Sequence, residues 1–260
     1  MVHPWKVPAA IAAFFGVSFL LLPTVAGAAG EERPPIDQLV HQIDQLYRSE
    51  SSQSEVEMQI HTSHWERTLT MDVWTDGTEK TFIRIESPAK EEGTGTLRIG
   101  NEMWNYLPKT NKVIRIPPSM MMGSWMGSDF TNDDLVKEFT FLDDYDFAYV
   151  SPEGEPDTLF YIDCVPHPDL AVVWGNVVIA VRKDSHLPVW QKYYDERGEL
   201  SRVLLFSDVR KLGGRTVPSV MKMMPQNKEE SWTLVRYREA EFDASVDDDV
   251  FSLRNLRSAD

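Results

Sequence analysis

Apolar and polar residues alternate with a period of two along most of this 260-residue chain, in short runs separated by turn dipeptides. The run Thr68–Val73 is an example, and the hairpin signal Asp76-Gly77 follows it. Runs that recur at roughly ten-residue intervals are the pattern of an antiparallel sheet with one apolar face. We therefore expect a mainly β protein with few helices, in which the sheet forms a barrel or a sandwich. The other alternating runs are Thr81–Glu86, Thr96–Ile99, Trp104–Tyr106, Ile114–Ile116, Leu159–Cys164, Val177–Val181, Val189–Tyr194, Leu200–Val209, Arg215–Met223 and Trp232–Arg238.

One amphipathic helix is expected before the first strands. Between Ile36 and Tyr47 the apolar side chains recur at a helical period, and Pro34 and Pro35 stand at its start. A shorter helical piece is expected at Asn132–Glu138. An apolar helical stripe has to be buried, so the first helix should pack on the rest of the domain.

The first residues carry the pattern of an export signal. A basic start is followed by the almost wholly apolar stretch Val7–Leu22 and by the small residues Ala26–Ala29. The apolar stretch is shorter than the roughly 20 residues of a membrane-spanning helix. We expect cleavage near Ala28, which would leave residues 29–260 as a single domain in the periplasm.

The cysteine count and the net charge narrow the possible classes of protein further. No cysteine follows the signal to carry a lipid anchor, and Cys164 is the only one, so no internal disulfide can form. The net charge of −15, without a basic stripe, excludes a nucleic-acid partner. It also opposes adsorption to anionic lipid head groups. A diffusing protein that reaches membranes through partners is favoured.

The most unusual segment is Pro117–Phe130, which contains four of the 11 methionines. Its paired prolines and its glycines prevent a regular strand, so a loop or a broken helix is expected. Methionine side chains are flexible and adapt to ligands of variable shape. Two interpretations remain open: an adaptable rim that contacts a lipid, or a loop that fills one end of the barrel.

The sequence contains only weak signals for catalysis. Gly123–Gly127 resembles a nucleophile elbow only loosely, because Ser124 is at its second position instead of its third. The acidic runs Asp133-Asp134, Asp143-Asp144 and Asp247–Asp249 would need to face one another across a cleft to act in glycoside hydrolysis. An envelope hydrolase that uses Ser124 or acidic residues is therefore the alternative, and we expect no enzymatic activity.

Metal binding has equally little support. His61 and His64 are three residues apart, as are Cys164 and His167. Zinc requires three or four ligands, and one such pair does not make a site. We expect neither a metal nor a cofactor.

Three stretches point to a known family. They are Gly95–Pro108, Lys112–Met122 and Trp125–Leu135, and the later elements Leu187-Pro188, Gly213–Arg215 and Phe251–Leu256 agree with them. Together they resemble the LolA-like outer-membrane lipoprotein-sorting proteins, over nearly the whole chain after the signal. The resemblance is most specific in Ile116–Leu135.

The resemblance implies a half-open antiparallel β-barrel whose apolar cavity is covered by a helical and loop lid. It implies a periplasmic carrier of lipid or of lipoprotein acyl chains, with an inner-membrane transporter as donor and an outer-membrane acceptor. A scaffold that binds no lipid remains a further alternative, and the cargo, lipoprotein or free lipid, stays open. The residues expected to line the cavity are Met71, Val73, Ile83, Ile85, Leu97, Ile99, Trp104, Tyr106, Ile114 and Ile116. Those expected to form its rim are Met120, Met121, Met122, Trp125, Met126 and Phe130.

Overall fold

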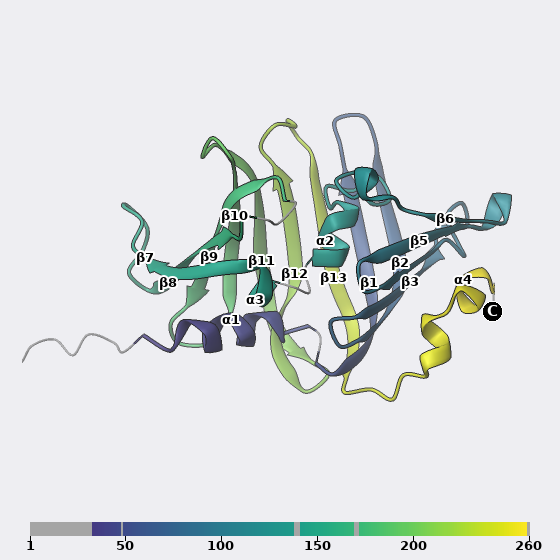
Figure 1. Ribbon diagram of the computed structural model, residues 1–260, viewed down its shortest axis with the longest axis horizontal. Coiled ribbons are helices and arrows are strands. Elements are labelled where there is room, and N and C mark those ends of the chain that lie inside the picture. Colours follow the sequence, from purple (N-terminus) through teal and green to yellow (C-terminus); the bar gives the residue numbers. More distant parts are fainter. Residues whose placement is uncertain (1–32, 48, 138–140, 169–171, 259–260) are drawn as a thin grey trace, which may run out of the picture. The chain divides into compact units, whose positions relative to one another are not determined.

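A single antiparallel sheet of thirteen strands dominates the computed structural model (Figure 1), which describes residues 33–47, 49–137, 141–168 and 172–258. The expected export signal lies outside these residues. The strands are β1 (Ser51–His61), β2 (Glu66–Asp76), β3 (Lys80–Ser87), β4 (Gly95–Ile99), β5 (Glu102–Leu107), β6 (Lys112–Arg115), β7 (Tyr145–Val150), β8 (Leu159–Pro166), β9 (Trp174–Arg182), β10 (Pro188–Asp195), β11 (Leu200–Leu212), β12 (Arg215–Pro225) and β13 (Trp232–Phe242). The helices are α1 (Ile36–Asp44), α2 (Asn132–Lys137), α3 (Phe141–Asp144) and α4 (Leu253–Arg257), with 3-10 turns η1 (Pro108–Thr110), η2 (Pro118–Met120) and η3 (Asp248–Phe251).

The strand order shows two meanders joined at one seam. It runs β6-β5-β4-β3-β2-β1-β13-β12-β11-β10-β9-β8-β7, and only the β1–β13 pair joins strands that are distant in sequence. β6 and β7 are the two edges of this order, so the sheet is curved but not closed. The expected fold class, a mainly β half-open antiparallel barrel, is confirmed.

One face of the sheet carries two clusters of buried apolar side chains, and we call it the inner face. Directly paired residues of antiparallel strands project to the same side. The pairs Met71↔Ile85 and Leu204↔Met223 lie on this side. Buried side chains of β1 to β3 and of β11 to β13 form one cluster here, and those of β8 and β9 form a second. Tyr193 packs against both clusters, which makes the inner face continuous.

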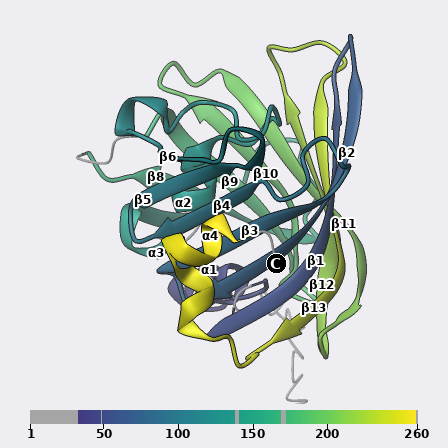
Figure 2. The same cartoon turned by 90° about the vertical axis from the view of Figure 1, so that its right-hand side faces the viewer.

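Helix α1 covers the inner face at the β7–β9 end of the sheet. Its Leu39 and Val40 are almost fully buried and pack with Phe160 and Ile162 of β8. The helix begins after Pro35 as expected, but it ends at Asp44, and Gln45 continues as a turn. In Figure 2, α2 and α3 lie on the same side of the sheet as α1. None of the described helices is long and apolar enough to cross a membrane.

The C-terminal segment covers part of the opposite face. Helix α4 lies against the sheet at β4 (Figure 2). Phe251 of η3 and Leu256 of α4 pack against Phe82 and Leu97, so this part of the sheet is apolar on both sides. Gly95 permits this approach, because a Cβ there would lie 2.7 Å from the Leu256 side chain. The β3–β5 region is therefore sandwiched between two layers.

Candidate functional site

A cavity of about 140 Å³ lies between α1, α2 and the inner face of β9 to β12. An apolar cavity of about 150 Å³ accommodates a benzene-sized ligand. The cavity in this structure thus has room for a short hydrocarbon segment. Its lining residues are Val40, Ile43, Asp44, Tyr47, Phe130, Asp133, Asp134, Tyr145, Val172, Trp174, Ile179, Pro188, Gln191, Tyr193, Leu204, Phe206, Met221 and Met223.

The period of two explains the apolar wall of the cavity. Leu204 and Phe206 alternate along β11, and their cross-strand partners Met223 and Met221 belong to β12. Each pair projects to the inner face and adds unbranched or aromatic side chains to the wall. Tyr47 closes one end, where its hydroxyl donates to the Pro218 carbonyl at 2.6 Å.

An ion pair joins the short helix α2 to the sheet beside this cavity. Arg202 of β11 donates from both terminal nitrogens to the Asp134 carboxylate, at 2.7 and 2.5 Å. The guanidinium side chain is only 5% exposed and lies over the rings of Trp174 and Tyr193. Burial lowers the pKa of Arg202, but the charge and hydrogen bonds of Asp134 outweigh this effect and raise the pKa, so Arg202 stays charged.

Asp134 also fixes the first turn of α2. Its carboxylate accepts from the Thr131 backbone amide at 2.7 Å, and the Thr131 hydroxyl accepts from the Asp134 amide at 3.1 Å. This reciprocal arrangement is a capping box. One carboxylate therefore both caps α2 and holds it against the inner face.

Tyr145 lies on the cavity wall as a neutral group. Burial, together with nearby acidic groups, raises the pKa of its phenol well above the ordinary value. A phenol at this position offers a hydrogen-bonding group without charge.

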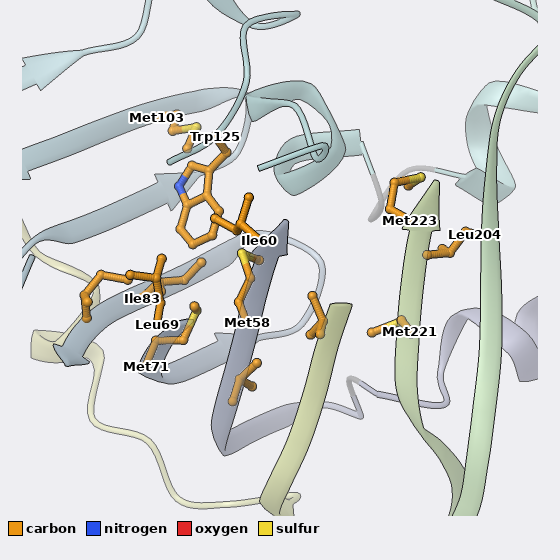
Figure 3. Packing of buried hydrophobic residues seen from close by; sticks show 13 residues of the cluster. Met58, Ile60, Leu69, Met71, Ile83, Met103, Trp125, Leu204, Met221 and Met223 are labelled. Atoms are coloured by element: carbon orange, nitrogen blue, oxygen red, sulfur yellow. The ribbon is translucent and has the colours of Figure 1, made fainter. Parts of the chain in front are cut away.

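The methionine-rich segment fills the other half of the inner face. Trp125 is 1% exposed and points into the cluster of β1 to β3, above Ile60 and Met58 (Figure 3). Its indole nitrogen donates to the Thr96 hydroxyl at 3.1 Å, and its backbone amide donates to the Phe130 carbonyl at 2.8 Å. We call Pro117–Phe130 the plug. Of the two interpretations left open by the sequence, this conformation matches the filling loop.

Comparisons with known proteins place this geometry in a wider group. A family model described as "-like: Uncharacterized protein" matches residues 77–258. The chain belongs to this family. No curated protein matches the chain.

Solved structures share the fold of this family member. A DUF1329 family protein from Desulfovibrio piger is 25% identical, with a TM-score of 0.75 over 85% of this chain and 97% of the other. A domain assigned to outer-membrane lipoprotein sorting in Vibrio parahaemolyticus is 20% identical, with a TM-score of 0.73 over 85% and 98%. A LolA superfamily protein from Nitrosomonas europaea is 19% identical, with a TM-score of 0.71 over 86% and 100%. The LolA-like resemblance expected from the sequence is confirmed for the fold.

The strand residues expected to line the cavity are divided between the two faces. Met71, Ile83 and Ile85 are buried on the inner face, and Val73 and Ile116 pack against them. Ile114 pairs with Asn105 on this side but is 43% exposed at the edge. The other four, Leu97, Ile99, Trp104 and Tyr106, lie on the opposite face.

The expectation that all ten strand residues share one face is therefore wrong. Leu97 pairs with Phe82, and both pack under the C-terminal segment. Apolar residues on β4 and β5 do not identify the inner face, because a second layer also covers the outer one.

The plug residues differ in exposure. Met121, Met126 and Phe130 pack against the inner cluster around Trp125, whereas Met120 and Met122 are 55% and 37% exposed. Only Phe130 of the sixteen expected residues lines the cavity itself. Their roles in ligand binding stay predictions.

Most of the residues that line the cavity are not among the sixteen that the sequence predicts. The runs that contain Leu204, Phe206, Met221 and Met223 are expected as strands, and the alternation within them is the available signal for an inner lining. The Arg202–Asp134 pair has no local signal, because its members are 68 residues apart.

The residues considered for hydrolase or metal chemistry are engaged in other contacts. Ser124 donates its hydroxyl to the Ser128 carbonyl at 2.5 Å, and no hydrogen bond joins it to a histidine of the described segments. His61 stacks on Trp232, and Cys164 is buried. Over the described ranges, no group of three or more histidine, cysteine or acidic side chains is arranged to hold a metal ion.

Proposed function

We propose that this protein is a periplasmic carrier that holds an acyl chain, of a lipid or of a lipoprotein, between the inner face of its sheet and the lid formed by α1 and α2. The observation that carries the proposal is the cavity of about 140 Å³ beneath α1, which side chains do not fill. Its wall includes Leu204, Phe206 and Met223, whose apolar surfaces suit hydrocarbon. One solved structure with this fold is assigned to outer-membrane lipoprotein sorting and another to the LolA superfamily, which supports this class of function.

The size of the cavity implies that the lid moves when cargo enters. Each methylene that leaves water contributes about 0.8 kcal/mol, so eight methylenes contribute about 6 kcal/mol. That gain is large enough to offset displacement of a short element such as α2, which the Arg202–Asp134 pair holds in place. The conformation with α2 against the sheet is then the closed form of the carrier.

Transfer requires partners at both ends of the route. An acyl chain is poorly soluble in water, so it leaves an apolar cavity readily only for another apolar environment, such as a membrane or an acceptor protein. An inner-membrane transporter as donor and an outer-membrane acceptor would supply loading and release. In this proposal the export signal, residues 1–28, brings the chain to the periplasm and is removed there.

The test is mass spectrometry of lipids that co-purify with the protein from the periplasm of a bacterial host. Leu204→Trp places a larger side chain in the cavity, and we expect it to reduce the bound lipid several-fold. Val209→Trp is the matched control, because Val209 is on the same strand but 50% exposed. Native protein that carries no lipid, or equal lipid in both variants, would refute the carrier function and favour a scaffold.

A further inference from the structure

A second hollow, which we call the groove, lies apart from the cavity. Its volume is about 990 Å³, and none of its lining residues lines the cavity. Three connections form it: the β1–β2 turn with Trp65, the β3–β4 connection at Pro88–Thr94, and the β5–β6 connection at Pro108–Thr110, together with Leu107 at the end of β5. The plug completes the wall with Met126 and Gly127. Sites for small molecules commonly have volumes of about 300–1,000 Å³.

The groove combines exposed apolar groups with positive charge. Trp65 is 44% exposed and Leu107 is 38% exposed, which is unusual for side chains of this size. Lys90, from the β3–β4 connection, and Lys109, from the β5–β6 connection, are exposed among the residues that line the groove. In a chain with a net charge of −15, two such lysines beside apolar surface are a local exception.

Each acidic residue of the groove contacts another polar side chain. Glu91 pairs with Arg67 at 3.2 Å, and Glu66 contacts the His61 ring at 3.3 Å. In the part of the chain that the structure describes, no carboxylate lies within ion-pair distance of Lys90 or Lys109. These two ammonium groups are therefore available to an external anion.

The wall on the plug side is built to fit closely. Arg67 donates to the Met126 carbonyl and lies over the Trp65 ring. Gly127 has a φ of +76°, and a Cβ there would lie 3.4 Å from the Arg67 guanidinium. A glycine at this turn lets the plug approach Arg67 and Trp65 without strain.

We propose that the groove binds a single anionic amphiphile. Lys90 and Lys109 would hold its phosphate or carboxylate, and Trp65 and Leu107 would contact the first methylenes of its chain. Charge complementarity supports this class of ligand, since apolar surface alone would suit a neutral one. A whole anionic membrane is the poorer partner, because the remaining surface of this acidic protein is repelled by it.

The test is calorimetric titration of the full exported protein with monomeric short-chain lipids. We expect dihexanoyl phosphatidylglycerol to bind about tenfold more tightly than zwitterionic dihexanoyl phosphatidylcholine. Lys90→Gln with Lys109→Gln should abolish that preference. Arg197→Gln with Lys211→Gln, which removes two exposed charges elsewhere, should retain it. Equal affinity of the native protein for both lipids, or a preference that survives in the lysine double variant, would overturn the proposal.

Two further titrations distinguish the groove from a simple ion site and from the cavity. Inorganic phosphate should bind at least about tenfold more weakly than phosphatidylglycerol, since it lacks the methylenes. If inorganic phosphate bound as tightly as phosphatidylglycerol, the groove would be an ion site and the proposal of an amphiphile would be wrong. Leu204→Trp fills the cavity and should leave the preference intact; its loss in that variant would place the lipid in the cavity and overturn the groove. The groove proposal can therefore be refuted without refuting the carrier proposal, and the carrier proposal can be refuted without refuting the groove proposal.

Discussion

Removing the charge of Asp134 is expected to loosen the lid. Asp134→Asn keeps an oxygen that can accept from the Thr131 amide, so the cap of α2 is largely preserved. It removes the negative charge that faces Arg202, whose side chain is 5% exposed. A buried guanidinium is then left without its counter-ion.

The magnitude follows from the two hydrogen bonds and the burial. Each hydrogen bond to a charged group contributes about 1.5–3 kcal/mol, and stranding one partner of a buried ion pair costs about 3–5 kcal/mol. Asp134 is 20% exposed and asparagine can still accept one bond, so we expect about 3 kcal/mol for Asp134→Asn. For Arg202→Met we expect about 2 kcal/mol, because the methionine retains part of the apolar packing on Trp174 and Tyr193.

A double-mutant cycle measures the coupling directly. Urea unfolding, followed by circular dichroism, gives the free energy of unfolding of the native protein, both single variants and the double variant. The double variant should lose about 3 kcal/mol instead of the sum of about 5, which is a coupling of about 2 kcal/mol. Additive losses, or a loss below about 1 kcal/mol for Asp134→Asn, would refute the idea that this pair holds α2 on the sheet.

Two other predictions concern the plug and the outer face. Trp125→Ala should lower the free energy of unfolding by about 3–5 kcal/mol, whereas Trp125→Phe should lower it by about 1–2 kcal/mol through the lost hydrogen bond to Thr96. Urea titrations of both variants measure these losses. Equal losses would show that the ring is not packed as described. Burial, and then the charge of Glu55, raises the pKa of Asp72, so its ionised form destabilises the fold at neutral pH. Asp72→Asn should therefore melt at a higher temperature than the native protein at pH 7, and the difference should disappear as the pH falls below the ordinary carboxyl value of 3.8. A variant that melts lower at pH 7 would contradict the assigned direction.

The sequence predicts the elements that have a clear period. Helix α1 and the strands from β8 to β13 follow stripes or alternation that a single sequence displays. β1 is missed: Val56, Met58 and Ile60 alternate with polar residues along its second half, but its first half, Ser51–Glu55, contains no apolar residue. Ser52 is nevertheless buried there, and its hydroxyl hydrogen-bonds the Thr75 hydroxyl of β2 at 2.7 Å. Pairing within the sheet, rather than local pattern, makes that segment a strand.

The candidate site is harder to predict than the fold. Residues of the first meander are expected to line the cavity, but Trp125 occupies the space above them. The cavity lies in the second meander, where α1 leaves room over Leu204 and Met223. Which half a loop fills depends on long-range packing, and the Arg202–Asp134 pair likewise exists only in the folded chain. Local periodicity carries no information about either.

The most direct test of the carrier proposal is photo-crosslinking with a fatty acid that bears a diazirine at the end of its chain. Peptide mapping should place the label on Val40–Tyr47, Leu204–Phe206 and Met221–Met223, the walls of the cavity. Leu204→Trp should remove most of that label, and Val209→Trp should not. Label concentrated on the outer face around Leu97 and Phe251, or distributed as in urea-unfolded protein, would contradict an acyl chain held between the lid and the inner face of the sheet.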